Sequence, residues 1–228
     1  MFWFGGPGTI FVLLAFVFAV YAQNRVSSVY NRYSRIGSRR GMTGGELARE
    51  LLRRGGLYDV TVEPIGGRLT DHYDPRTRRV RLSQEIYHGN SLAALGIAAH
   101  ETGHAMQHQE QYAPLHLRNA FVPVAQFGSQ LAWPMFLFGL LFNSPGLADL
   151  GILLFLAAVI FQVITLPVEF NASRRAVALL SDGGYLTAQE IKPVQSVLQA
   201  AALTYVAAAA TAVAQLLRLV LLRNSRRG

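Results

Sequence analysis

Three histidines spaced four residues apart stand in the stretch AAHETGHAMQH, residues 98–108: His100, His104 and His108, with Glu101 directly after the first. Residues four apart lie on one face of an α-helix, so His100 and His104 can both offer an imidazole nitrogen to one metal ion. Glu101 lies about 100° around the helix from His100 and can reach a water molecule without binding the ion. The HExxH spacing therefore predicts a zinc site with Glu101 as general base for hydrolysis of peptide bonds. An ordinary helix with incidental histidines is the alternative.

A catalytic zinc site needs three protein ligands and one open position, so a residue outside HExxH must complete the site. His108 continues the row of histidines, but it would lie about 12 Å along the helix axis from His100, too far to share one ion. Glu110 stands ten residues after His100, where one class of zinc protease has its third ligand. That class turns the chain back with a glycine at the position that Gln107 occupies here, which disfavours Glu110.

Glu169 is the carboxylate further along the chain that best fits a third ligand. It follows a long apolar run in the stretch LPVEFNASRRA, and a carboxylate at that place needs a partner of opposite charge. A zinc ion is one such partner, and Arg174 or Arg175 is the alternative. We therefore predict that zinc is bound by His100, His104 and Glu169.

The composition limits what kind of protein can position these groups. The 228 residues include no cysteine, so the chain has no disulfide and any metal must be held by His, Asp or Glu. Hydrophobic residues make up 51% of the chain and gather in four long apolar runs: 2–22, 121–142, 150–168 and 194–222. The first run is about long enough to cross a bilayer and lacks the features of a cleaved signal peptide, which predicts a retained anchor helix.

The distribution of basic residues predicts an orientation in the membrane. The second and third apolar runs are joined by the tight turn NSPGLAD and predict a membrane hairpin. Fourteen arginines lie between residues 25 and 118, whereas the residues before the first run and in the turn carry none. Because basic residues favour the cytoplasmic side, we expect 25–118 in the cytoplasm and the N-terminus outside. A last run that also crossed would place the basic tail RNSRRG outside, against this rule, unless that helix packs within or along the membrane.

Several separate stretches resemble the YugP-like family of membrane-bound neutral zinc metallopeptidases: LTDHYDPRTRRVRLS, AAHETGHAMQH, YAPLHLRNAFVPVA, LPVEFNASRRA and AALTYVAAA, in this order. The similarity extends from about residue 43 to about residue 217. The order of HExxH, membrane hairpin and glutamate helix is also distantly similar to the HtpX and Ste24 membrane proteases. The resemblance implies a gluzincin-type site, with His100, His104 and Glu169 as zinc ligands and Glu101 as general base.

One position departs from the pattern of the more distant relatives. Their glutamate helix usually carries an aspartate four residues after the glutamate, and this aspartate steadies a zinc-binding histidine. This chain has Ser173 at that position. Support for a histidine ligand must then come from Ser173, from Asn171 or from elsewhere.

The expected fold is a mainly α membrane protein with a small cytoplasmic α+β, zincin-like part. Residues 42–56 predict a short helix with a capping box formed by Thr43 and Glu46, and residues 58–83 predict a short β-meander. Asn90 or Ser91 can begin the helix of the metal motif. The expected parts of the chain are an anchor helix at 1–23, the cytoplasmic part of the protease domain at 24–118, the transmembrane hairpin at 119–168, the glutamate helix and its loop at 169–193, and the C-terminal apolar helix with its basic tail at 194–228.

These features predict a zinc-dependent metalloendopeptidase that cleaves membrane-associated or cytoplasmic proteins near the membrane surface. Zn²⁺ would activate water, and Glu101 would take the proton of that water and pass it to the leaving amine. A further group must stabilise the oxyanion, and the candidates are His72 or Tyr73 and, on the last apolar run, Tyr205. The strand predicted at 78–83, RRVRLS, could pair with an extended substrate backbone.

The expected partners are a peptide or protein substrate and the lipid bilayer. The excess of arginine is explained by orientation in the membrane and by attraction to anionic lipid, so we expect no nucleic acid. The oligomeric state stays open. The alternative function is a non-catalytic membrane scaffold, or a zinc-binding protein, that retains the protease fold. Glu101 argues against that alternative because only catalysis requires its side chain.

Overall fold

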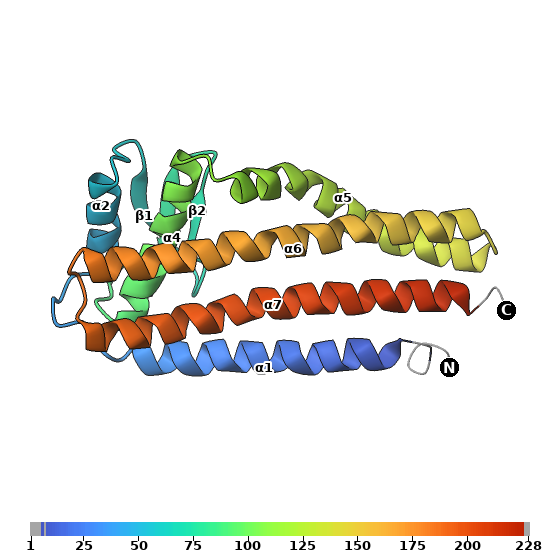
Figure 1. Cartoon of the computed structure of the whole chain (residues 1–228), viewed down its shortest axis with the longest axis horizontal. Coiled ribbons are helices and arrows are strands. Elements are labelled where there is room, and N and C mark those ends of the chain that lie inside the picture. The colour runs from blue at the N-terminus through green and yellow to red at the C-terminus, as the bar shows by residue number, and fades with distance from the viewer. Residues whose placement is uncertain (1–5, 7, 226–228) are drawn as a thin grey trace. The chain divides into compact units, whose positions relative to one another are not determined.

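The computed structural model describes residue 6 and residues 8–225 of the chain. These described residues are mainly helical and form seven helices and three short strands (Figure 1): α1 Thr9–Tyr33, α2 Gly44–Arg54, β1 Thr61–Ile65, β2 His72–Asp74, β3 Arg79–Ser83, α3 Gln84–His88, α4 Leu92–Gln109, α5 Ala113–Leu141, α6 Pro145–Asp182 and α7 Ala188–Asn224. They divide into two compact units. The apolar unit comprises 1–23, 116–167 and 203–228, and the α/β unit comprises 24–115 and 168–202.

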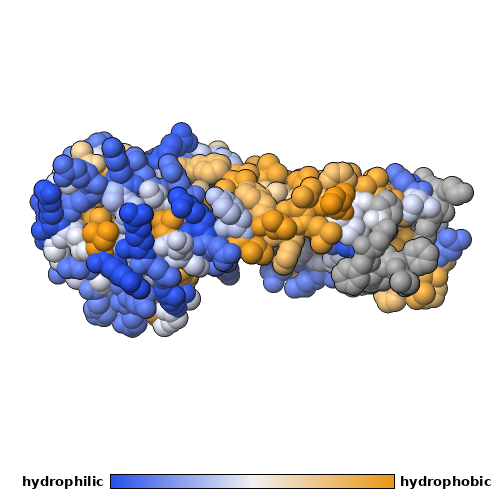
Figure 2. Space-filling model, turned by 90° about the horizontal axis from the view of Figure 1, so that it is seen from below, coloured by the Kyte–Doolittle hydropathy of each residue, from blue (hydrophilic) through white to orange (hydrophobic). Residues whose placement is uncertain are grey.

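The apolar unit is built from helices that are long and apolar enough to cross a bilayer. Among the described residues four helices meet this condition, α1, α5, α6 and α7, as the four apolar runs predicted. On the face shown in Figure 2, hydrophobic side chains cover much of this unit, whereas the surface of the α/β unit is mainly hydrophilic. A helix that exposes large apolar side chains is stable in lipid and not in water. The exposed residues include Leu14, Phe16, Val17, Phe127 and Leu153.

Helix α7 extends as far as the turn between α5 and α6. Arg223, in the last turn of α7, donates hydrogen bonds of 2.7 and 2.6 Å to the two carboxylate oxygens of Asp149. Asp149 lies in the first turns of α6, next to that turn. Within the apolar unit, α7 therefore runs alongside the hairpin to its tip. Arg223 is the first residue of the basic tail whose location outside the cell the positive-inside rule disfavours. The ion pair with Asp149 neutralises this one charge of the tail.

Helix α6 continues without a break through Pro167. Proline removes one backbone hydrogen bond and usually kinks or ends a helix. Here Val168 and Glu169 follow within the same 38-residue helix. The third apolar run and the glutamate-bearing segment are thus parts of a single helix.

The sheet of the α/β unit is not the predicted meander. The strand order is β1-β3-β2, with β1 parallel to β3 and β2 antiparallel to it. A meander requires neighbouring strands to be consecutive and antiparallel. The chain instead returns β3 to the centre of the sheet. Strand β2 is left as one edge, with His72 paired to Arg81 and Tyr73 paired to Val80.

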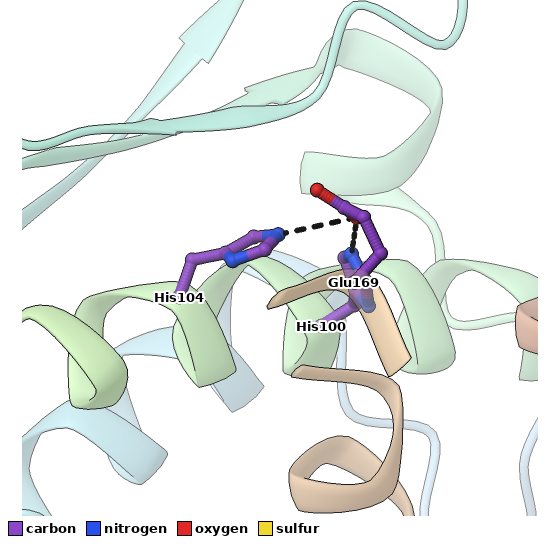
Figure 3. A group of neighbouring side chains, drawn as sticks. All are labelled: His100, His104 and Glu169. Carbon is purple, nitrogen blue, oxygen red and sulfur yellow. Dashed lines mark hydrogen bonds and ion pairs between the residues drawn. The ribbon is translucent and has the colours of Figure 1, made fainter. Parts of the chain in front are cut away.

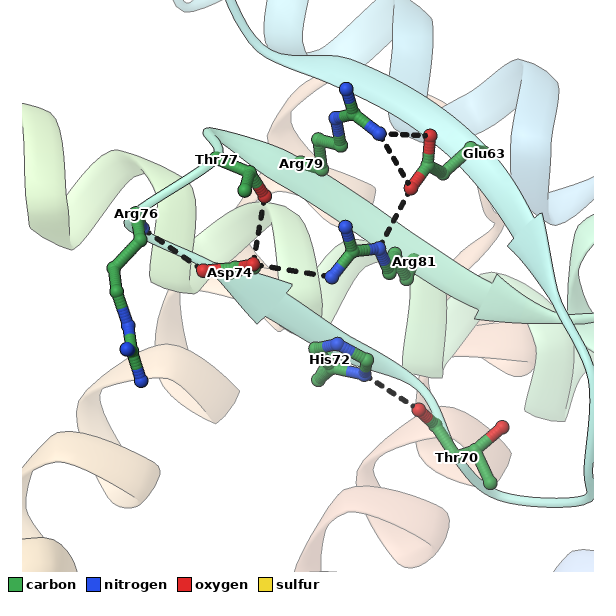
Figure 4. A network of polar contacts seen from close by, with 8 residues as sticks. All are labelled: Glu63, Thr70, His72, Asp74, Arg76, Thr77, Arg79 and Arg81. Carbon is green, nitrogen blue, oxygen red and sulfur yellow. Dashed lines mark hydrogen bonds and ion pairs between the residues drawn. The ribbon is translucent and has the colours of Figure 1, made fainter.

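The two faces of the sheet have different chemistry. Val80 and Leu82 are fully buried in a core that also contains alanines of α4. The opposite face carries a polar network (Figure 4). Arg81 of β3 lies at its centre and binds Glu63 of β1 at 2.7 Å and Asp74 of β2 at 3.1 Å. These ion pairs link all three strands across the face that is turned away from the core.

Local signals in the sequence explain where the two helices of the α/β core begin. Thr43 and Glu46 form the predicted capping box at the start of α2. Ser91 caps α4, and its hydroxyl oxygen accepts a hydrogen bond from the backbone of Ala94 at 3.1 Å. Both predictions of a helix start are therefore confirmed.

Two glycines of α4 allow neighbouring helices to approach closely. A β-carbon on Gly103 would lie 3.0 Å from the carbonyl oxygen of Ala172 in α6. A β-carbon on Gly96 would lie 2.9 Å from the side chain of Val194 in α7. The contact at Gly103 is with backbone, which cannot move aside as a flexible side chain can. The glycine inside the sequence HETGH therefore brings α6 against the face that carries the histidines.

Candidate metal centre

The structure brings together the three side chains that the sequence predicted as metal ligands. His100 and His104 lie on successive turns of α4, and Glu169 reaches them from α6 (Figure 3). The Nε2 atom of His100 lies 3.3 Å from Oε2 of Glu169, and Nε2 of His104 lies 3.6 Å from the same oxygen. The three ligand atoms all lie within 4.8 Å of one another. All three residues belong to the α/β unit.

These distances fit a zinc ion better than direct hydrogen bonds. Zinc in proteins is tetrahedral with bonds of about 2.0–2.2 Å, so two of its ligand atoms lie about 3.3–3.6 Å apart. A charged hydrogen bond between nitrogen and oxygen is shorter, about 2.7–2.9 Å. Two histidine nitrogens that converge on one carboxylate oxygen at 3.3 and 3.6 Å therefore have the spacing of metal ligands. Three ligands on a tetrahedral ion leave the fourth position open, as in catalytic sites.

The other ring nitrogen of each histidine has a partner of its own. Nδ1 of His100 lies 3.2 Å from the hydroxyl of Ser173, and Nδ1 of His104 lies 3.0 Å from Oε1 of Gln107. Partners at Nδ1 hold the ring in place and leave Nε2 for the metal. Ser173 was one of the two residues predicted for this role. Gln107 was considered only as the residue that replaces a glycine, because its position gave no sign of its contacts.

Glu101 lies on α4 in a buried position beside the metal ligands and is 8% exposed. Burial raises the pKa of Glu101 to about 7, and the nearby charge of Glu169 acts in the same direction. The charge of His100 and a backbone hydrogen bond from Tyr73 on β2 oppose this rise. A carboxyl group whose pKa is near neutrality is suited to accept a proton and return it.

The two residues that competed with Glu169 as third ligand have other partners. The carboxylate of Glu110 accepts two hydrogen bonds of 2.7 Å from Arg175. This bidentate pair also occupies one of the arginines that offered an alternative partner for Glu169. Nδ1 of His108 lies 2.8 Å from the hydroxyl of Tyr73, so the third histidine of the row contacts strand β2.

The structure does not bring the proposed oxyanion donor His72 into the group of ligands. His72 pairs with Arg81, so its side chain lies on the polar face of the sheet, away from the core shared with α4 (Figure 4). Its Nδ1 lies 2.8 Å from the carbonyl oxygen of Thr70. Tyr205 belongs to the apolar unit, outside the unit that holds the three ligands. A role for Tyr205 as a donor stays a prediction from the sequence.

Comparisons with known proteins find related sequences. Residues 8–224 match the model of a family described as "Putative neutral zinc metallopeptidase". The chain is 52% identical over 202 residues to the "Putative membrane protease YugP" of Bacillus subtilis (strain 168). That match covers 89% of this chain and 90% of the relative. No solved structure matches the chain. The relative and the four apolar helices together indicate a membrane protein.

Proposed function

Because the chain belongs to the family of neutral zinc metallopeptidases, we propose that it hydrolyses peptide bonds with a zinc ion held by His100, His104 and Glu169. The observation that carries this proposal is the convergence of two histidine nitrogens from α4 and one carboxylate oxygen from α6. Glu101 lies beside this group and is not one of the ligands. A site that only stored zinc would not need a buried carboxylate there.

The residues of the chain account for the proton transfers of hydrolysis. When bound, zinc supplies a Lewis acid that polarises a carbonyl group and makes water more acidic. Glu101 accepts a proton as the water oxygen bonds to the carbonyl carbon of the peptide. It then delivers this proton to the amide nitrogen as the carbon–nitrogen bond breaks, which leaves a carboxylic acid and an amine. His100, His104 and Glu169 hold their positions throughout because their helices are packed together at Gly103.

We further propose that strand β2 binds the substrate backbone, in place of the strand that the sequence suggested. The predicted strand at 78–83 contains β3, which has a neighbour on each side and cannot pair with a third chain. Strand β2 is an edge, and the backbone of Tyr73 is directed towards Glu101. An extended peptide that adds to this edge would pass next to the general base. The tyrosine side chain is fixed to α4 through His108, which holds the edge in place.

The proposed activity depends on the metal, so its removal is the first test. We expect the detergent-purified protein to cleave a quenched fluorescent casein and to lose this activity after treatment with 1,10-phenanthroline. One equivalent of zinc should restore the activity after the chelator is removed, because removal of the ion breaks no covalent bond of the protein. Cleavage that survives complete removal of zinc would contradict the proposal.

We also propose that the protein is multi-pass, that its active site faces the cytoplasm, and that it cleaves proteins at or near the membrane surface. Of the 21 lysines and arginines, 17 lie outside the last 11 residues, and 16 of these belong to the α/β unit. Basic residues favour the cytoplasmic side, which predicts that the α/β unit is inside and the α5–α6 turn outside.

The absence of cysteine makes this orientation easy to test. A β-carbon on Gly66 or on Gly146 would meet no atom within 4 Å, so a single cysteine fits at either position. Gly66 lies just after β1 in the α/β unit, and Gly146 lies at the start of α6. In intact cells a membrane-impermeant maleimide should label Gly146→Cys, whereas Gly66→Cys should react only after permeabilisation. The reverse pattern would place the active site outside.

A further inference from the structure

Gln107 is a fully enclosed polar side chain next to the metal ligands. It is 0% exposed and lies on α4, one turn after His104. Its Oε1 atom lies 3.0 Å from Nδ1 of His104. Its Nε2 atom donates two hydrogen bonds of 2.9 Å, to the carbonyl oxygen of Val168 and to Oδ1 of Asn171, both on α6. All the polar atoms of this buried amide therefore have partners.

The two partners on α6 decide which way the amide is turned. The carbonyl of Val168 can only accept a hydrogen bond, so the NH₂ group of Gln107 must point to α6. Its oxygen then faces His104, and an oxygen of this kind can only accept. Nδ1 of His104 must carry a proton, so in the neutral ring the lone pair is on Nε2, the atom that faces Glu169. The orientation of the Gln107 side-chain amide thus selects the tautomer of His104 that can bind a metal through Nε2.

A second set of hydrogen bonds, nearer the surface of the protein, also fixes the orientation of the Gln107 amide. Arg175 donates through Nε to Oδ1 of Asn171 at 2.7 Å, so this oxygen is also committed as an acceptor. The same arginine is fixed by its bidentate pair with Glu110 at the end of α4. A continuous set of hydrogen bonds therefore runs from His104 through Gln107, Asn171 and Arg175 to Glu110, and it passes from α4 to α6 and back.

We propose that Gln107 is a positioning residue that prepares both parts of the metal site. It holds His104 in the form and direction needed for zinc, and it ties α4 to the backbone of the residue next to Glu169. The inference rests on the proposed zinc site and extends it to a residue outside the HExxH motif. Loss of a partner of this kind lowers metal affinity by roughly 10- to 100-fold in other zinc proteins.

Two substitutions at this position separate positioning from simple packing. Gln107→Met has a similar volume and removes all three hydrogen bonds. Gln107→Glu keeps an acceptor for His104 and removes the two donors to α6. Gln109→Met is the matched control, because Gln109 is an exposed glutamine of the same helix. Zinc affinity is measured by competition with a chromophoric chelator, and thermal unfolding of the zinc-free protein is followed in parallel.

We expect Gln107→Met to bind zinc roughly 10- to 100-fold more weakly than the parent. Gln107→Glu should stay within a few fold of the parent in zinc affinity. Its zinc-free form should nevertheless unfold at a lower temperature, because a carboxylate would face the two acceptors on α6. Gln109→Met should match the parent in both measurements.

Two results would overturn the inference. An unchanged zinc affinity in Gln107→Met would show that His104 does not need this partner. Equal losses of affinity in the methionine and glutamate variants, in step with their losses of thermal stability, would show a packing role alone. A parent that binds no zinc would instead contradict the proposed function itself, so the two failures are distinguishable.

Discussion

Replacing Glu101 by glutamine is expected to lower the rate of peptide hydrolysis by about 10²- to 10⁴-fold, the range that a positioned general base contributes. Glutamine has nearly the same size and can occupy the same buried position, but it cannot accept a proton from water. The zinc content should stay near one ion per chain, because Glu101 is not among the three residues that converge on the site. The measurement is steady-state cleavage of a quenched fluorescent substrate, with elemental analysis of the same samples.

The combination of lost activity and retained zinc is what distinguishes an enzyme from a zinc-binding scaffold. A scaffold has no use for the proton-accepting group, so its function would survive this substitution. A partly exposed glutamate of α2, Glu50, provides the matched control, Glu50→Gln, since this glutamate pairs with Arg53 and Arg54 and belongs to no part of the metal site. Activity of Glu101→Gln close to that of the parent would mean that another group acts as the base, or that hydrolysis comes from a contaminating protease.

Replacing Glu169 by alanine is expected to reduce the zinc content from near one ion per chain to nearly none after dialysis against a weak chelator. The carboxylate supplies one of the three ligand atoms, and two histidines alone hold zinc weakly. Hydrolysis should fall with the zinc content. Elemental analysis of detergent-purified protein gives the result directly, and circular dichroism checks that the helices are retained.

The variant Glu110→Ala is measured alongside Glu169→Ala, because the spacing after HExxH also allowed Glu110 as the third zinc ligand. In the structure its carboxylate is bound by Arg175, so this variant should keep its zinc. Zinc retained in Glu169→Ala and lost in Glu110→Ala would transfer the role of third ligand to Glu110. Loss of zinc in both variants would show that the pair with Arg175 supports the site more strongly than we expect.

The metal ligands could be predicted from the sequence because each carries a local signal. His100 and His104 are one helical turn apart, so their meeting depends only on the presence of a helix. Glu169 was found by elimination, as an acid that follows an apolar run and so needs a partner. The helix starts at Thr43 and Ser91 were likewise predictable, because a capping side chain bonds to backbone only three residues away.

The features that the sequence did not predict all depend on contacts between distant segments. Strand order is one of them: β1 and β3 pair in parallel, and nothing in the pattern of a three- to five-residue strand fixes its neighbour. The environment of Gln107 is another, since its donors reach Val168 and Asn171 more than 60 residues away.

The order of the ligands along the chain has a consequence for biosynthesis. Both histidines are on α4 and the third ligand is on α6. All of α5 and the first part of α6 lie between them in the chain. A ribosome therefore completes His100 and His104 well before it reaches Glu169. If α5 and α6 form the proposed membrane hairpin, we expect the carboxylate to join the histidines only after these two helices have folded back on each other in lipid. A newly made chain that fails to insert lacks one zinc ligand, so the proposed peptidase would be inactive wherever it is not in a membrane.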